Sequence, residues 1–132
     1  MRGFLVLSLF TLLIIGCSDN NPVKPENHDP IIESLTAFPT IIGLTDSVVI
    51  VCDATDPDGD TLVYDWITDG RLRVKDALRR EHFLYNTYEN SHVFYPDSAI
   101  HPPVDTPWVQ CFARDRKGGQ SVPKLVEFIV RQ

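Results

Sequence analysis

Alternation of apolar and polar residues dominates the chain after residue 30 and restricts it to β-structure. Successive strand side chains point to opposite faces of a sheet, so each alternating segment buries one face. No segment beyond residue 30 keeps a helical period for three turns. Strands are therefore expected at 31–38, 47–54, 62–67, 106–115 and 122–131, with one short helical turn at 74–80. This pattern predicts an all-β sandwich.

The same alternation predicts which side chains face the core. Every second residue of a strand shares a face, so one inward residue assigns its neighbours. The inward set is then Val48, Ile50, Cys52, Ala54, Leu62, Tyr64, Trp66, Val109, Cys111, Ala113, Val126, Phe128 and Val130. Asp65 and Glu127 fall on the opposite faces of their strands.

The N-terminus carries a different signal. Arg2 precedes an apolar run over residues 4–15, which ends in Ile14-Ile15-Gly16-Cys17 and a polar stretch. That run has the length of a signal-peptide core and is short for a membrane span. The last four residues resemble the lipobox of bacterial lipoproteins. The resemblance implies a signal peptide at 1–16, cleavage before Cys17 and lipidation of Cys17.

Cleavage before Cys17 would leave 116 residues, the size of one domain with a tether. We expect residues 17–29 to be the lipidated cysteine and a flexible tether, and residues 30–132 to be the domain. Loss of Arg2 makes the net charge −7, which disfavours nucleic acid and anionic membrane surfaces as partners. Membrane contact should therefore run through the lipid anchor. Ser18 after the cysteine favours the outer membrane of the cell envelope, by resemblance to enteric lipoprotein sorting.

Two cysteines remain once Cys17 is assigned to lipid. Cys52 and Cys111 lie in a chain expected to leave the reducing cytoplasm, where a disulfide is the natural interpretation. Closing a loop of about 60 residues is worth roughly 4 kcal/mol in the chain-entropy model. Two buried free thiols are the alternative, because free cysteine is commonly buried.

The order Cys52, Trp66, Cys111 resembles that of an immunoglobulin-like sandwich, in which the cysteines lie on opposite sheets and the tryptophan packs on them. The tyrosine corner is missing, since Val109 occupies its position. The stretch 54–66, with its Asp-Pro-Asp-Gly-Asp turn, and the stretch 115–121 resemble PKD-like domains. The resemblance covers about residues 30–132 and implies a PKD-like β-sandwich of the kind that serves as a spacer, adhesion or binding module.

Three carboxylates crowd the turn at Asp56, Asp58 and Asp60, and like charges so close repel unless a cation or water separates them. Loops at one end of such a sandwich cluster, so Asp115 could complete a calcium site. Calcium is the one cofactor that the sequence suggests. The alternative is a plain turn, in which Asp-Pro and Asp58-Gly59 set the backbone and the aspartates cap their own amides.

The segment 71–95 is rich in basic and aromatic residues. Arg71, Arg73, Tyr85 and Tyr88 could form a ligand patch in which aromatic rings stack on sugar or peptide and arginines bind carboxylates. The alternative is ordinary minor strands of the sandwich, because aromatic residues are enriched in strands.

No catalytic pattern is apparent. The four histidines are dispersed, and the chain has no Gly-x-Ser-x-Gly elbow and no cysteine and histidine cluster with zinc spacing. The sequence therefore predicts a non-enzymatic lipoprotein that acts as a binding, adhesion or scaffold module, with an envelope protein or a glycan as partner. A carbohydrate-binding module and a calcium-stiffened spacer are the alternatives.

Overall fold

The computed structural model describes residues 24–74, 83–100 and 103–131. These residues form strands joined by turns and irregular connections: β1 (Ile31–Phe38), β2 (Ile41–Gly43), β3 (Val48–Thr55), β4 (Val63–Thr68), β5 (Leu72–Val74), β6 (Phe83–Thr87), β7 (Ser91–Pro96), β8 (Val104–Asp105), β9 (Trp108–Arg114), β10 (Lys124–Glu127) and β11 (Ile129–Arg131). The described part of the chain contains no helix long and apolar enough to cross a bilayer.

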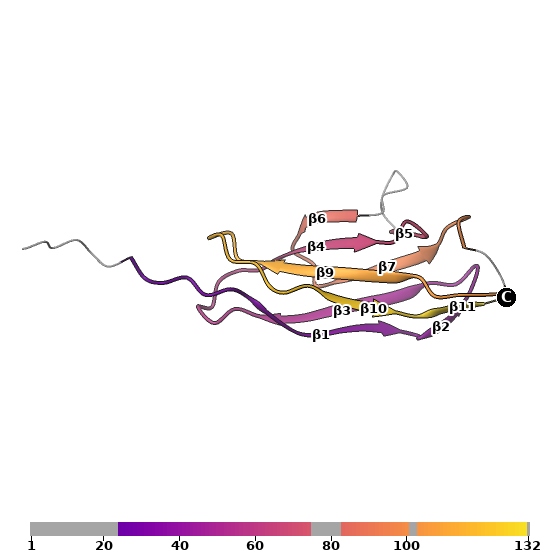
Figure 1. Ribbon diagram of the computed structural model, residues 1–132, viewed down its shortest axis with the longest axis horizontal. Helices are drawn as coiled ribbons and strands as arrows, with labels where there is room; N and C mark the ends of the chain where they lie inside the picture. The colour runs from indigo at the N-terminus through magenta and orange to yellow at the C-terminus, as the bar shows by residue number, and fades with distance from the viewer. Residues whose placement is uncertain (1–23, 75–82, 101–102, 132) are drawn as a thin grey trace, which may run out of the picture.

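Two four-stranded sheets form the body of the domain. One has the order β1-β3-β7-β5 and the other the order β10-β9-β4-β6, with antiparallel pairing throughout. Figure 1 shows the strands running lengthwise through an elongated molecule. The chain enters at one end, beside the turn between β3 and β4, and the C-terminus lies at the opposite end.

A third sheet of order β2-β11-β8 extends the sandwich at the C-terminal end. The chain passes from β1 to β2 through a cis peptide bond at Phe38-Pro39. β2 then pairs parallel with β11, with Ile41 opposite Ile129. The first and last segments of the domain are thereby hydrogen-bonded to each other.

The core lies between the two four-stranded sheets, and Trp66 on β4 is its largest fully buried side chain. The indole meets His92 edge-on at 5.3 Å and lies 6.2 Å from Phe94, both on β7 of the facing sheet. Its Nε1 donates to the hydroxyl of Thr87 at 3.1 Å, which satisfies the one polar group of the ring. The indole N–H is therefore hydrogen-bonded although the ring lies in an apolar core.

The predicted inward residues are largely buried. Strands at 31–38, 48–55, 63–68 and 108–114 confirm four of the expected segments to within two residues at either end. The last segment is divided into β10 and β11, because the chain exchanges its partner β9 for β2 and β8 at Phe128. Phe128 itself is 3% exposed. The expected helical turn at 74–80 lies almost wholly outside the described residues.

Asp65 differs from its predicted environment. It lies on the face of β4 away from the core, as expected, yet it is only 8% exposed. Arg114 covers it with an ion pair of 2.8 Å, and the backbone N–H of Asn86 donates to it at 2.8 Å. The outer face of this sheet therefore buries a charged pair that alternation alone cannot reveal.

A matched pair of leucine truncations tests the core. Leu72→Ala removes a fully buried side chain and should lower the free energy of unfolding by about 2–5 kcal/mol. Leu125→Ala removes a half-exposed side chain on an edge strand and should cost less than about 1 kcal/mol. Urea unfolding followed by tryptophan fluorescence measures both. Equal losses for the two variants would contradict the assigned core.

Candidate functional site

The turn between β3 and β4 is built on Asp56. Its Oδ1 accepts hydrogen bonds from the backbone N–H groups of Asp58 at 2.8 Å and Asp60 at 3.1 Å. Gly59 follows with φ 74°, a conformation that glycine adopts without a steric penalty. The turn geometry predicted from Asp-Pro-Asp-Gly is therefore present, and one oxygen of Asp56 serves it.

The turn between β9 and β10 is likewise held by one aspartate, Asp115. Its Oδ1 accepts from the backbone N–H groups of Lys117, Gly118 and Gly119 at 2.7 to 3.0 Å. Its Oδ2 accepts from the side-chain amide of Asn27 at 2.5 Å. These donors, with Asn27 the largest contributor, hold the pKa of Asp115 below its ordinary value. A side chain at Gly119 would collide with the Asp115 carboxylate, so any larger residue there would have to displace this carboxylate from its hydrogen bonds.

Asp56, Asp60 and Asp115 converge into an acidic corner at this end of the sandwich. One ligand atom from each lies within 4.8 Å of the others. Lys117 binds Oδ1 of Asp60 at 2.7 Å, but Oδ2 of Asp60 and Oδ2 of Asp56 are buried without a hydrogen-bond partner. Buried carboxylate oxygens with no donor are costly, and a hard cation with oxygen ligands would relieve that cost.

The structure does not bring Asp58 into the acidic corner. Its carboxylate instead accepts from the backbone N–H of His28 at 2.7 Å and pairs with the imidazole Nδ1 at 3.0 Å. Of the four residues predicted for calcium, three therefore meet and the fourth holds the N-terminal segment.

Residues 27–29, predicted as part of the tether, are docked on the domain. Asn27 binds Asp115, His28 binds Asp58, and Asp29 accepts from the backbone N–H of Gln120 at 3.2 Å. Sequence reasoning missed these contacts, because each joins residues 30 to 91 positions apart and no local pattern marks them. The chain thus enters the domain through a fixed contact with both turns.

The predicted patch of arginines and tyrosines is divided by the fold. Arg71 binds Asp69 and Asp105 and the carbonyl of Thr106, and its pKa is raised first by the hydrogen bond to Asp69. Arg71 therefore holds the connection between β4 and β5 against β8 and the residue that follows it. Arg73 lies on β5 of one sheet, whereas Tyr85 lies on β6 of the other.

Tyr88 follows β6 and meets a different arginine. The guanidinium of Arg116 lies 4.8 Å from the centre of its ring and donates to its hydroxyl. Tyr85 instead packs against Phe83, with ring centres 5.1 Å apart, and both rings are about half exposed. The arginine that serves Tyr88 lies 28 residues further along the chain, outside the predicted patch.

The cysteine prediction is half correct. Cys52 on β3 and Cys111 on β9 face each other from opposite sheets, fully buried, as the order of residues predicted. The predicted disulfide is not formed in this structure: both are free thiols, 3.5 Å apart. A disulfide requires about 2.05 Å between sulfurs. The neighbouring Cys52 sulfur, and then burial, raise the pKa of Cys111 above its ordinary value.

Comparisons with known proteins bear on the fold. No family model and no curated protein matches the sequence. Among solved structures, the PKD domain of an M14-like peptidase from Thermoplasmatales archaeon SCGC AB-540-F20 superposes with a TM-score of 0.52 at 20% identity. The match covers 81% of this chain and 100% of that one. The chain therefore has the immunoglobulin-like, PKD-like β-sandwich that the sequence predicted.

The contact of His28 with Asp58 should depend on pH. Asp58 raises the pKa of His28 above 6.5, so the His28 contribution is complete below pH 6.5 and is lost as pH rises through the raised value. The backbone N–H and ring of His28 lower the pKa of Asp58 below 3.8, so that contribution is lost as pH falls through the lowered value. The contact should be strongest between these limits.

Hydrogen exchange measures this dependence. The His28 amide, which donates to Asp58, should have a higher protection factor at pH 5.5 than at pH 8.5, after correction for intrinsic exchange rates. His28→Gln, which cannot become charged, should remove the difference. A protection factor that is the same at both pH values in the unaltered chain would contradict the assignment.

Proposed function

We propose that the protein is a lipid-anchored, non-catalytic module of the bacterial cell envelope whose immunoglobulin-like domain binds another envelope component. The observation that carries the proposal is the docking of residues 27–29 onto the turns at one end of the sandwich. These hydrogen bonds fix the direction in which the chain enters the domain, which matters if residues before 27 are attached to something. A fixed entry orients the domain relative to whatever holds the N-terminus.

The lipobox-like residues 14–17 supply the anchor in this proposal. Lipidation of Cys17 would place residues 18–26 between the lipid and the docked segment, a length of chain that reaches at most roughly 30 Å. The acidic net charge argues for attachment through lipid rather than through a basic surface. The acidic corner would then lie at the membrane-proximal end, and the third sheet at the distal end (Figure 1).

A binding role suits the observed chemistry better than catalysis. The two thiols that might act as nucleophiles are fully buried, and Asp65 and Arg71 are held in ion pairs that stabilise connections. One carboxylate oxygen of Asp56 and one of Asp115 accept hydrogen bonds from backbone amides of their own turns. These groups build a rigid scaffold, which is the usual support for a binding loop.

Anchoring is tested by the mature N-terminus. Protein from native membranes should begin at Cys17, carry acyl chains by intact mass, and sediment with the membrane fraction. Cys17→Ala should abolish the acyl mass and membrane retention, because the thiol is the attachment point. Ser18→Ala, a neighbouring substitution that spares the thiol, should change neither. An unmodified N-terminus in the unaltered protein would contradict the proposal.

A second role is favoured by the two buried oxygens without partners, Oδ2 of Asp56 and Oδ2 of Asp60. We propose that calcium binds in the acidic corner and stiffens the end of the sandwich. Asp56, Asp60 and Asp115 come from both turns, so an ion held among them would link β3–β4 to β9–β10. Lys117 would release Oδ1 of Asp60 when the ion binds.

Thermal unfolding with and without calcium tests this role. At 100 times its dissociation constant, calcium should add about 2.7 kcal/mol to the free energy of unfolding and raise the midpoint. Asp60→Asn should abolish the rise while leaving the Asp56 and Asp115 turns capped. Asp53→Asn removes the same charge from an exposed position on β3 and should preserve the rise. An unchanged midpoint in millimolar calcium would exclude the site.

A further inference from the structure

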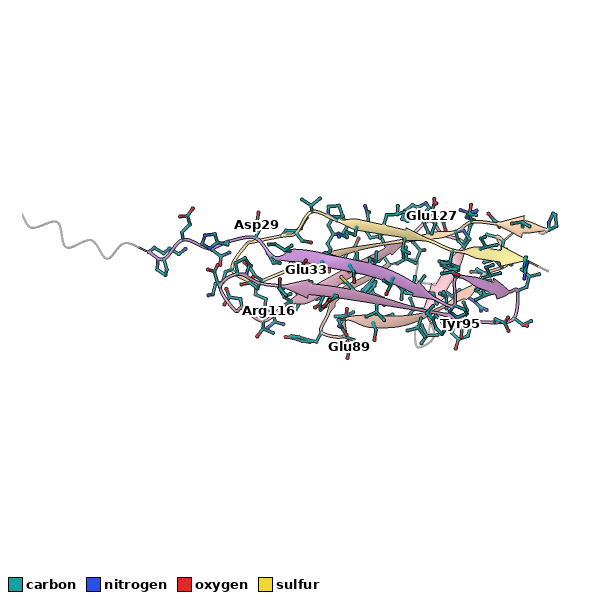
Figure 2. The ribbon with its side chains drawn as sticks, turned by 90° about the horizontal axis from the view of Figure 1, so that it is seen from below. Asp29, Glu33, Glu89, Tyr95, Arg116 and Glu127 are labelled. Atoms are coloured by element: carbon teal, nitrogen blue, oxygen red, sulfur yellow. The ribbon has the colours of Figure 1, made fainter. Side chains whose placement is uncertain are left out.

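The end of the sandwich that residues 27–29 contact also has a pocket of about 470 Å³, beside the turn between β9 and β10. Its lining comes from three places in the chain and includes Val63, Asn86, Arg114, Arg116, Gly118 and Gln120. The volume falls within the range of small-ligand sites, about 300–1,000 Å³. Figure 2 shows Arg116 at the same end of the molecule as Asp29.

The pocket contains one positive charge that no described carboxylate pairs with, in an acidic protein. Two arginines line it and no carboxylate does, although the chain as a whole carries a net charge of −6. Arg114 is committed to Asp65 and to the side-chain oxygen of Asn86, and its Nε is buried without a partner. Arg116 contacts the ring and the hydroxyl of Tyr88 and forms no ion pair with any described residue, so no carboxylate among them neutralises its charge.

The backbone of the pocket is strained at two positions. Asn86 has φ 56° and Arg116 has φ 63°, and among the described residues they are the non-glycine residues with positive φ. Arginine rarely adopts this conformation, which glycine would adopt freely. Such positions cluster at ligand sites, where the surrounding structure holds them. Both lie in the pocket lining, and the strained backbone presents the Arg116 side chain beside Tyr88.

We propose that this pocket binds a carboxylate-bearing sugar unit of an envelope polysaccharide. The guanidinium of Arg116 would hold the carboxylate through two parallel hydrogen bonds, a geometry that arginine favours. The amides of Asn86 and Gln120 would meet the hydroxyls of the sugar ring. Tyr88 would position the guanidinium, which it contacts through its ring and its hydroxyl. The inference deepens the proposed binding role and rests on it.

The lining favours a sugar over a peptide carboxylate. Val63 is the apolar side chain of the lining, and it is only 2% exposed. A peptide terminus would need an apolar recess for its last side chain, whereas amides and backbone glycines suit a ring that carries several hydroxyls. The hydrogen-bonding side chains of Asn86, Arg116 and Gln120 in the lining therefore favour the sugar.

Calorimetry with a defined probe tests the proposal. The full chain, purified in detergent, is titrated with tetragalacturonate and with the same oligosaccharide after methyl esterification of its carboxylates. The acid form should bind and the ester should not. Arg116→Asn keeps a residue that tolerates the left-handed backbone and should weaken binding at least about tenfold. Arg131→Asn, which removes an arginine from β11 at the opposite end, should bind as the unaltered chain does.

Each contrary outcome overturns a distinct part of the proposal. Equal binding of acid and ester excludes carboxylate recognition, and binding of a free peptide carboxylate in place of the uronate excludes the sugar. No binding of any probe excludes the pocket. Crosslinking in whole cells keeps the wider role separate: if Arg116→Asn still captures the same envelope component, the pocket proposal fails while the binding module stands.

Discussion

The carboxylate of Asp115 organises the end of the molecule on which the functional argument depends. It is 2% exposed and accepts hydrogen bonds from three successive backbone amides and from Asn27. One charged group therefore closes the turn between β9 and β10, fixes the entry of the chain and leaves little room for a side chain at position 119. The same turn carries Arg116 and the glycines of the pocket lining.

The sandwich brings two chemically opposite features to this end. The acidic corner of Asp56, Asp60 and Asp115 offers buried oxygens to a cation, while Arg116 offers an uncompensated guanidinium to an anion. Both depend on the same turn, in which Asp115 is buried and Arg116 is exposed. A calcium ion in the acidic corner would therefore also stiffen the backbone that presents Arg116, which links the two proposals physically.

Period-two patterns predicted much of the fold, because β3 and β9 alternate buried residues with more exposed ones. β4 is buried on both faces, which its alternation did not predict. The short strands β5, β6 and β7 were not assigned, since each gains its place from partners rather than from its own alternation. The Asp-Pro-Asp-Gly turn was correctly predicted, and Asp115 was correctly placed beside it. The disulfide was not formed in the structure, because sequence places two sulfurs in proximity without determining whether they bond.

The pocket could not have been predicted in the same way. Its residues come from β4, β6, β9 and the turn after β9, and two of them, Asn86 and Arg116, have left-handed backbone conformations. Arginine at a left-handed position carries no local signature, because nothing in the residues around Arg116 demands that conformation. The predicted Arg71 and Arg73 lie elsewhere: Arg71 pairs with Asp69 and Asp105, and Arg73 lies on β5.

The central claim is that ligands meet this protein at the end organised by Asp115. The most direct test is a backbone amide NMR map of the full chain titrated with solubilised envelope polysaccharide. The account predicts that chemical-shift changes concentrate at residues 56–60, 86–88 and 114–120. Changes confined to the outer sheet face around Phe83 and Leu125, or to the C-terminal sheet, would contradict it.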